Sequence, residues 1–164
     1  MTKERMPAIV WVIVCAAAII QALYYYPQLP ERIATHFGAS GHADGWSTKQ
    51  DFITVYLGIL AFVIALFTVL TYAVSTLPVS WINLPNKQYW FAAQQRQQTL
   101  AFLRRYPLWF ASATVLLIID MFHQTFLVNM GKAKSLPHPT LSLAVYIGFT
   151  AYWVIGLFLR FRKP

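Results

Sequence analysis

Three ionisable side chains that could bind a metal or move a proton stand close together in one polar segment of the sequence. They are His36, His42 and Asp44. Imidazole and carboxylate groups are common ligands of divalent metals. The spacing His36-x5-His42-x-Asp44 matches no standard metal motif, however. A compact structural loop folded over neighbouring helices is therefore the favoured interpretation, and a metal site is the alternative.

A second ionisable group, Asp120 with His123, lies inside an apolar run. The i, i+3 spacing predicts that both side chains lie on one helical face. A carboxylate inside a bilayer costs ~2.5–3.5 kcal/mol on insertion scales, so Asp120 should face the bundle and find a partner, with His123 or Lys49 as candidates. Gln21 is a polar residue at a similar depth. Three interpretations stay open: a structural Asp–His pair, a proton or ligand sensor, and a metal site of His36, Asp44 and His123.

The composition identifies a membrane protein. Hydrophobic residues make up 58% of the 164 residues and charged residues only 11%, whereas soluble domains carry about 25% charged residues. The net charge of +8 does not indicate nucleic-acid binding, because Lys and Arg lie at the ends of apolar runs, where they set topology and contact anionic lipid. The sequence contains no recognisable nucleophile, zinc-protease or phosphate-loop motif. We therefore expect no catalytic residues and no cofactor, with a divalent metal as the alternative.

Four apolar runs predict transmembrane helices over about 8–26, 52–77, 108–128 and 141–159. Between the second and third runs, the second part of the polar segment 79–106 is weakly amphipathic and predicts a short helix on the membrane surface. The expected fold is thus all-α: a single membrane domain over residues 1–164, built as a four-transmembrane-helix bundle. It would have an ordered extracytoplasmic loop and an interfacial cytoplasmic helix.

The distribution of basic residues predicts the orientation in the membrane. One side carries nine of them: Lys3, Arg5, Lys87, Arg96, Arg104, Arg105, Arg160, Arg162 and Lys163. The other side carries Arg32, Lys49, Lys132 and Lys134. The richer side is expected to be cytoplasmic. Both termini would then face the cytoplasm, and the segment 29–49 would face outward.

The composition of segment 29–49 predicts tight turns. Gly38, Gly41 and Gly45 could adopt positive φ, and Asp44-Gly45 is a typical turn pair. Lys49 could contact lipid phosphate or pair with Asp44.

Two further residues of the hydrophilic segments invite an interpretation. Together with Lys49, Arg32 could also capture a peptide carboxylate or an anionic headgroup, although interface anchoring explains both residues as well. His138, between two prolines, is expected to be an exposed connector residue.

The sequence of segment 29–49 resembles the signature of the bacterial membrane family called domain of unknown function 1648. The residues that carry the resemblance are Leu29, Pro30, His36, Phe37, Gly41, Asp44, Gly45, Trp46 and Lys49, followed by Ile82, Asn83, Leu84, Pro85, Asn86, Lys87, Tyr89 and Trp90. The similar region covers about 24–90. One departure is Ala34, where the family more often has proline.

This resemblance implies a multi-pass protein of the bacterial cytoplasmic membrane, of the SdpI immunity or signalling type. The 29–49 loop would bind a secreted peptide or envelope ligand, and the basic cytoplasmic segment would recruit a cytoplasmic protein such as a repressor. A small proton-coupled transporter using Asp120 and His123, and a metal-dependent membrane enzyme, are the alternatives. A homodimer is compatible with so small a bundle. In each case we expect the loop to pack onto Asp120 and His123 and to form one pocket.

Overall fold

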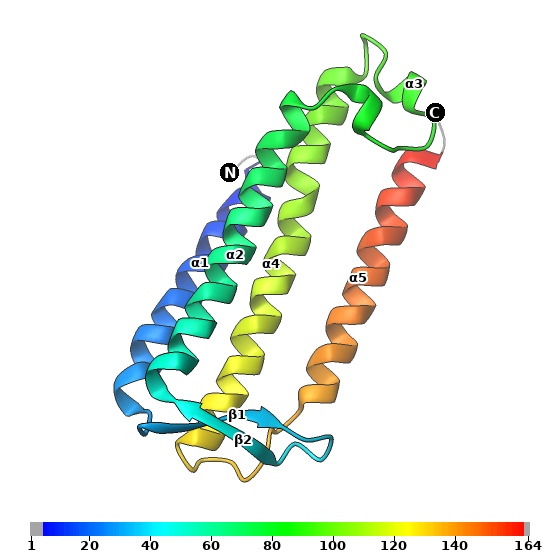
Figure 1. Cartoon of the computed structure of the whole chain (residues 1–164). Coiled ribbons are helices and arrows are strands. Elements are labelled where there is room, and N and C mark those ends of the chain that lie inside the picture. The colour runs from blue at the N-terminus through cyan, green and yellow to red at the C-terminus, as the bar shows by residue number, and fades with distance from the viewer. Residues whose placement is uncertain (1–4, 163–164) are drawn as a thin grey trace.

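The computed structural model describes residues 5–162 and contains four long helices. They are α1 (Met6–Tyr25), α2 (Lys49–Thr76), α4 (Arg96–Asn129) and α5 (Pro139–Arg162). Each is long and apolar enough to cross a membrane, which confirms the four predicted spans and indicates a multi-pass membrane protein. The start of α1 and the end of α5 lie at the same end of the bundle (Figure 1). We call it the terminal end, and we call the opposite end the hairpin end.

Helix α4 is central to the packing. It contacts α1, α2 and α5, whereas the main neighbour of α5 is α4, so that α5 stands to one side in Figure 1. Ala18 of α1 and Ala111 of α4 are fully buried, and such small side chains let membrane helices approach closely. Tyr56 of α2 stacks on Phe122 of α4, with ring centroids 4.1 Å apart. Many other apolar side chains point outward, as expected for helices surrounded by lipid.

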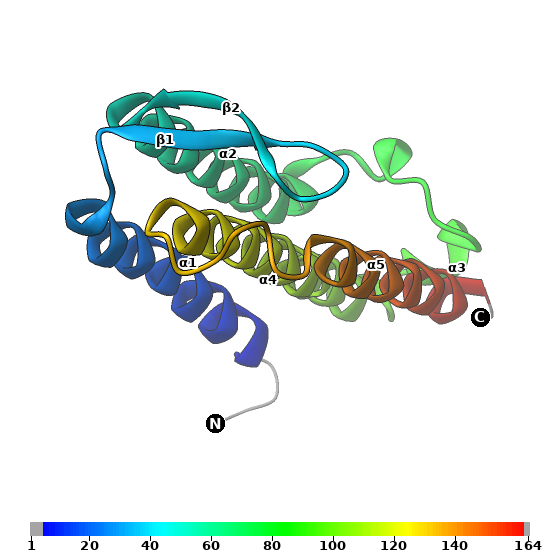
Figure 2. The same ribbon diagram turned by 90° about the horizontal axis from the view of Figure 1, so that it is seen from below.

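The segment between α1 and α2 is not purely a loop. After a short 3-10 turn, η1 (Tyr26–Gln28), it forms two antiparallel strands, β1 (Arg32–Phe37) and β2 (Ala43–Thr48). The prediction of an all-α fold is therefore wrong in this segment. Its β-branched and aromatic residues, among them Ile33, Thr35 and Trp46, favour strands. Figure 2 shows this β-hairpin lying across the ends of the helices.

The hairpin is fixed to the bundle at two places. Asn129, the last residue of α4, accepts a hydrogen bond from the Ala34 backbone N–H (2.7 Å) and donates one to the Ala34 carbonyl (3.0 Å). At the hairpin tip, the Gly41 carbonyl accepts a hydrogen bond from the Leu136 N–H (3.0 Å) in the α4–α5 connector. Next to Ala34, Ile33 is completely buried. These contacts hold the hairpin in a defined position.

The junction between β2 and α2 is a capped helix start. The Thr48 hydroxyl oxygen accepts a hydrogen bond from the Asp51 backbone N–H (3.1 Å), and it lies 2.7 Å from the Asp51 carboxylate. This arrangement satisfies a free N–H group in the first turn of the helix and places a negative charge at its positive end. The cap explains why α2 begins at Lys49.

The segment between α2 and α4 contains a 3-10 turn, η2 (Val79–Trp81), and a single helical turn, α3 (Lys87–Trp90). The separate interfacial helix expected in its second part is not formed, because α4 begins at Arg96 and continues through Pro107 to Asn129. A proline removes one backbone hydrogen bond, and membrane helices tolerate it where neighbouring groups compensate. The polar residues before Pro107 are therefore the first turns of α4.

Candidate functional site

The exposed side of the hairpin carries a cation–aromatic pair and an imidazole–carboxylate pair. The side chain of Trp46 is half exposed, and the Arg32 guanidinium carbon lies 5.6 Å from the centre of its ring. His36 Nδ1 contacts the Asp44 carboxylate. The His36 and Asp44 side chains are 76% and 52% exposed, so this pair is accessible to solvent.

The glycines of the hairpin serve different purposes. Gly41 has φ of 77°, the positive value predicted for a turn. Gly45 lies opposite His36 in the sheet, and a Cβ atom there would lie only 2.8 Å from the His36 Cβ. The expectation that Asp44-Gly45 forms the turn is wrong, because both residues lie within β2. The β-bulge register and the close approach of His36 explain this glycine instead.

Lys49 and Phe37 lie at opposite ends of the hairpin. The Lys49 Nζ donates a hydrogen bond to the Leu29 carbonyl (3.1 Å) and lies 4.6 Å from the centre of the Tyr26 ring. No contact joins it to Asp44 among the described residues, so Lys49 closes the base of the hairpin. Phe37 is half-buried at the end of β1 next to the turn.

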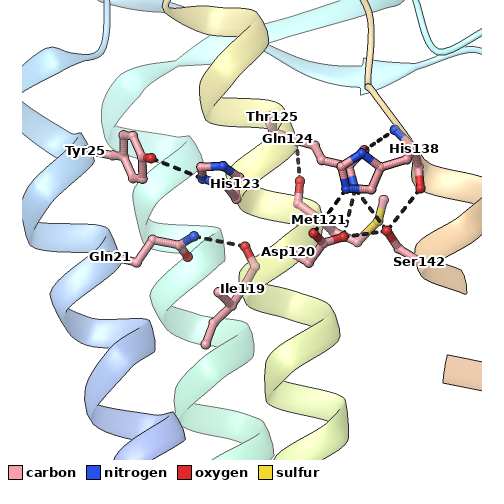
Figure 3. Close-up of polar contacts among 10 residues, drawn as sticks. All are labelled: Gln21, Tyr25, Ile119, Asp120, Met121, His123, Gln124, Thr125, His138 and Ser142. Carbon is pink, nitrogen blue, oxygen red and sulfur yellow. Dashed lines mark hydrogen bonds and ion pairs between the residues drawn. The ribbon is translucent and has the colours of Figure 1, made fainter. Parts of the chain in front are cut away.

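Asp120 joins α4 to α5 through a polar cluster (Figure 3). Its Oδ2 accepts hydrogen bonds from the Ser142 hydroxyl (2.5 Å) and from Gln124 Nε2 (2.8 Å). The His138 ring Nε2 lies 3.5 Å from Asp120 Oδ1. The His138 backbone N–H donates a hydrogen bond to Gln124 Oε1 (2.9 Å). His138 is thus a member of this cluster as well as an exposed connector residue. Ser142 was not predicted as a site residue, although it lies four residues after His138, a spacing that places both on one side of a helical turn.

His123 belongs to a different set of contacts, which faces α1. Its Nδ1 lies 3.1 Å from the Tyr25 hydroxyl, as Figure 3 shows. One turn deeper, Gln21 donates to the Ile119 carbonyl (2.9 Å) and accepts from the Tyr56 hydroxyl (2.6 Å). The predicted Asp120–His123 pair is therefore not formed. Residues three positions apart differ by about 60° around a helix, which is enough to direct them to different neighbouring helices.

The expected single pocket, made by the hairpin on Asp120 and His123, is also absent from the described part of the chain. The hairpin meets α4 at Asn129, more than one turn beyond His123. The structure brings His36 and Asp44 together but leaves His123 with Tyr25. Among residues 5–162, no group of three His, Cys, Asp or Glu side chains could hold a metal ion. The contacts thus do not assemble the predicted metal site.

A groove of 520 Å³ lies between α4 and α5. Apolar side chains form most of its lining, from Trp109 near the terminal end to Leu141 near the hairpin end. Asp120, His138 and Ser142 form its polar end. The groove is thus apolar along most of its length and acidic at one end.

The predicted cytoplasmic motif residues hold the end of α5. Asn86, with φ of 51°, donates to the carbonyls of Phe161 (3.2 Å) and Arg162 (2.6 Å). Trp90 Nε1 also donates to the Phe161 carbonyl (3.2 Å). These donors satisfy carbonyls that are left free at a helix C-terminus. Lys87 donates to the Ser80 carbonyl; Asn83 is exposed and Pro85 is half-buried.

The part of the chain that contains the hairpin matches a known protein family. Residues 13–66 match the family model described as domain of unknown function (DUF1648). The predicted family is confirmed over this segment. The DUF1648 segment includes the whole hairpin with most of α1 and α2, whereas the stretch from Asn83 to Trp90 lies outside the match. No curated protein and no solved structure matches the chain.

Proposed function

We propose that this chain is a non-enzymatic membrane protein of the SdpI immunity or sensor type, which binds an extracytoplasmic peptide or envelope ligand through residues 29–49. One observation carries the proposal. The hairpin is fixed to α4 by Asn129, while Trp46 and Arg32 stay exposed on it. A preorganised surface loses little entropy when it binds a ligand, and Trp and Arg are common energetic centres of interfaces.

The chemistry of these side chains suits a peptide with a free carboxylate. The Arg32 guanidinium can donate two parallel hydrogen bonds to a carboxylate. Trp46 offers a flat apolar surface beside it. The adjacent His36–Asp44 pair adds an imidazole and a carboxylate for polar contacts.

The proposal places the protein in the bacterial cytoplasmic membrane with both termini in the cytoplasm. Basic residues concentrate at the terminal end, including Arg96 and Arg104 at the start of α4 and Arg160 and Arg162 at the end of α5. Positively charged ends are retained in the cytoplasm. The hairpin would then face outward. A cytoplasmic protein partner would meet the basic terminal end.

The two alternative functions have less support. A proton-coupled transporter built on Asp120 and His123 needs the two groups to exchange protons, yet Asp120 contacts α5 and His123 contacts α1. A metal-dependent enzyme needs a ligand set that the contacts of the described residues do not assemble. The proposed binding of a ligand at the hairpin uses two pairs of neighbouring side chains, Arg32 with Trp46 and His36 with Asp44.

Photo-crosslinking in living cells tests the proposed function. A photoreactive phenylalanine analogue replaces Trp46 in one strain and Trp81 in a control strain; Trp81 is an exposed tryptophan at the terminal end. The cells are irradiated in the presence of the peptide fraction that the same species secretes. We expect a discrete peptide adduct at position 46, none at position 81, and loss of the adduct when Arg32→Ala is added. Absence of an adduct at position 46, or equal adducts at both positions, contradicts the proposal.

A further inference from the structure

The groove between α4 and α5 combines two properties that the packing of the bundle does not require. Its walls are apolar over most of their length, and its hairpin end contains the Asp120 carboxylate. Its volume of 520 Å³ lies within the ~300–1,000 Å³ typical of small-molecule sites. This site is separate from the hairpin surface and does not depend on the proposed function.

The Asp120 carboxylate has one oxygen available to a further donor. Both short hydrogen bonds, from Ser142 and Gln124, go to Oδ2. Oδ1 has His138 Nε2 at 3.5 Å, which is beyond the usual length of a charge-assisted hydrogen bond. Ser142 and Gln124 thus orient the carboxylate and leave Oδ1 with acceptor capacity. The Asp120 side chain is 36% exposed, so a ligand atom can reach it.

The charges at this end of the groove select the sign of a ligand. Asp120 is the acidic residue that lines the groove, and the other two polar residues there are Ser142 and His138. A phosphate or carboxylate would be repelled by Asp120. A protonated amine would gain a charge-assisted hydrogen bond to the carboxylate.

The apolar part of the groove sets the shape of the ligand. From Trp109 to Asp120 the lining follows α4 for roughly 16 Å, at a rise of about 1.5 Å per residue. This is about the length of an extended dodecyl chain. Val145 and Phe149 of α5 line the same length.

We propose that this groove binds a single-chain cationic amphiphile, with its primary ammonium group on Asp120 Oδ1 and its alkyl chain along α4 and α5. The apolar walls accommodate the alkyl chain as surrounding lipid tails would, so that the carboxylate supplies the selectivity for an amine. His138 lies at the polar end of the groove, next to the ammonium position.

Dodecylamine is the probe for this site. Native mass spectrometry of the whole chain, released from a non-ionic detergent, counts bound molecules directly. We expect one dodecylamine per chain, and little binding of dodecanol or dodecanoate, which have the same chain but no cation. Competition by dodecanol equal to that of dodecylamine would show a general apolar groove and overturn the proposal. Displacement of the amine by phosphatidylcholine would show that an ordinary lipid occupies the groove and would equally overturn it.

Three variants test where the probe binds. Asp120→Asn should weaken dodecylamine binding by at least about tenfold, because the charge-assisted hydrogen bond is lost. Glu31→Gln, which changes an exposed acid just before β1 instead, should leave binding unchanged. Ala113→Phe fills the apolar part of the groove and should abolish binding. It is an independent test that remains available if Asp120→Asn fails to fold. Unaltered binding in folded Asp120→Asn or Ala113→Phe protein refutes the site.

Discussion

Asn129 holds Ala34 by both of its backbone polar groups. Asn129 Oδ1 accepts a hydrogen bond from the Ala34 backbone N–H (2.7 Å), and Asn129 Nδ2 donates one to the Ala34 carbonyl (3.0 Å), as a neighbouring strand would. A side chain at the end of α4 thereby fixes the position of β1. Together with the Leu136–Gly41 hydrogen bond, it attaches the hairpin to the bundle.

Replacing Asn129 by alanine should loosen the hairpin. The change removes two hydrogen bonds worth roughly 0.5–1.5 kcal/mol each and leaves the N–H and carbonyl groups of Ala34 without that partner. Hydrogen exchange in peptides that cover 32–48 should become faster, while exchange in α2 stays slow. The Asn129→Asp variant keeps the acceptor and loses the donor, so its effect should be intermediate. Unchanged protection of β1 in Asn129→Ala would show that the amide does not position the hairpin.

Gly45→Ala should destabilise the protein. The new Cβ would lie 2.8 Å from the His36 Cβ, and the resulting strain typically costs about 1–3 kcal/mol. Gly58→Ala is the matched control, since nothing lies within 4 Å of a Cβ added there in α2. The thermal unfolding midpoint in detergent should fall for Gly45→Ala and stay level or rise for Gly58→Ala. Equal midpoints for the two variants would contradict the close approach of β1 and β2 at this pair.

Ser142→Ala should weaken the attachment of α5. The Ser142 hydroxyl donates to Asp120 Oδ2 at 2.5 Å between helices, and a hydrogen bond to a charged group is worth about 1.5–3 kcal/mol. In the control Ser112→Ala, the lost hydrogen bond goes to Leu108 of the same helix. The thermal midpoint should fall further for Ser142→Ala than for Ser112→Ala. A larger effect of Ser112→Ala would show that the polar cluster does not secure α5.

Labelling of single cysteines checks the orientation in the membrane. In a Cys15→Ser background, Ser40→Cys places a thiol at the hairpin tip and Ser80→Cys places one at the terminal end. A membrane-impermeant maleimide added to intact cells should label position 40 and spare position 80. Labelling of both positions should follow lysis of the cells. The reverse pattern in intact cells would place the hairpin in the cytoplasm and would rule out an extracytoplasmic ligand for it.

The parts of the fold that follow from local composition were predictable. The four apolar runs identified the spans, because burial in lipid requires long uninterrupted apolar helices. The strands were not predicted, because the glycines and the polar residues of 29–49 have the composition of a loop. One partner of β1 is the side chain of Asn129, which is remote in sequence.

The candidate sites show the same division between local and distant information. The proximity of His36 and Asp44 was expected, since both lie in one short segment. The partner of Asp120 was not found, because helical spacing alone cannot tell which neighbouring helix a side chain meets. Ser142 and His138 come from the next helix and its connector, and only the packing of α5 on α4 brings them to Asp120.

The central claim is that the hairpin forms the ligand-binding surface. The most direct test takes the peptide identified by photo-crosslinking, in its free form, and measures its affinity for purified protein in nanodiscs. Three proteins are compared: the unaltered chain, Trp46→Ala and Trp81→Ala, where Trp81 is an exposed tryptophan at the opposite end. Loss of an aromatic interface anchor typically costs at least about 2 kcal/mol. We predict that Trp46→Ala weakens binding by more than about tenfold and that Trp81→Ala binds like the unaltered chain. Equal affinity of all three proteins would contradict the claim.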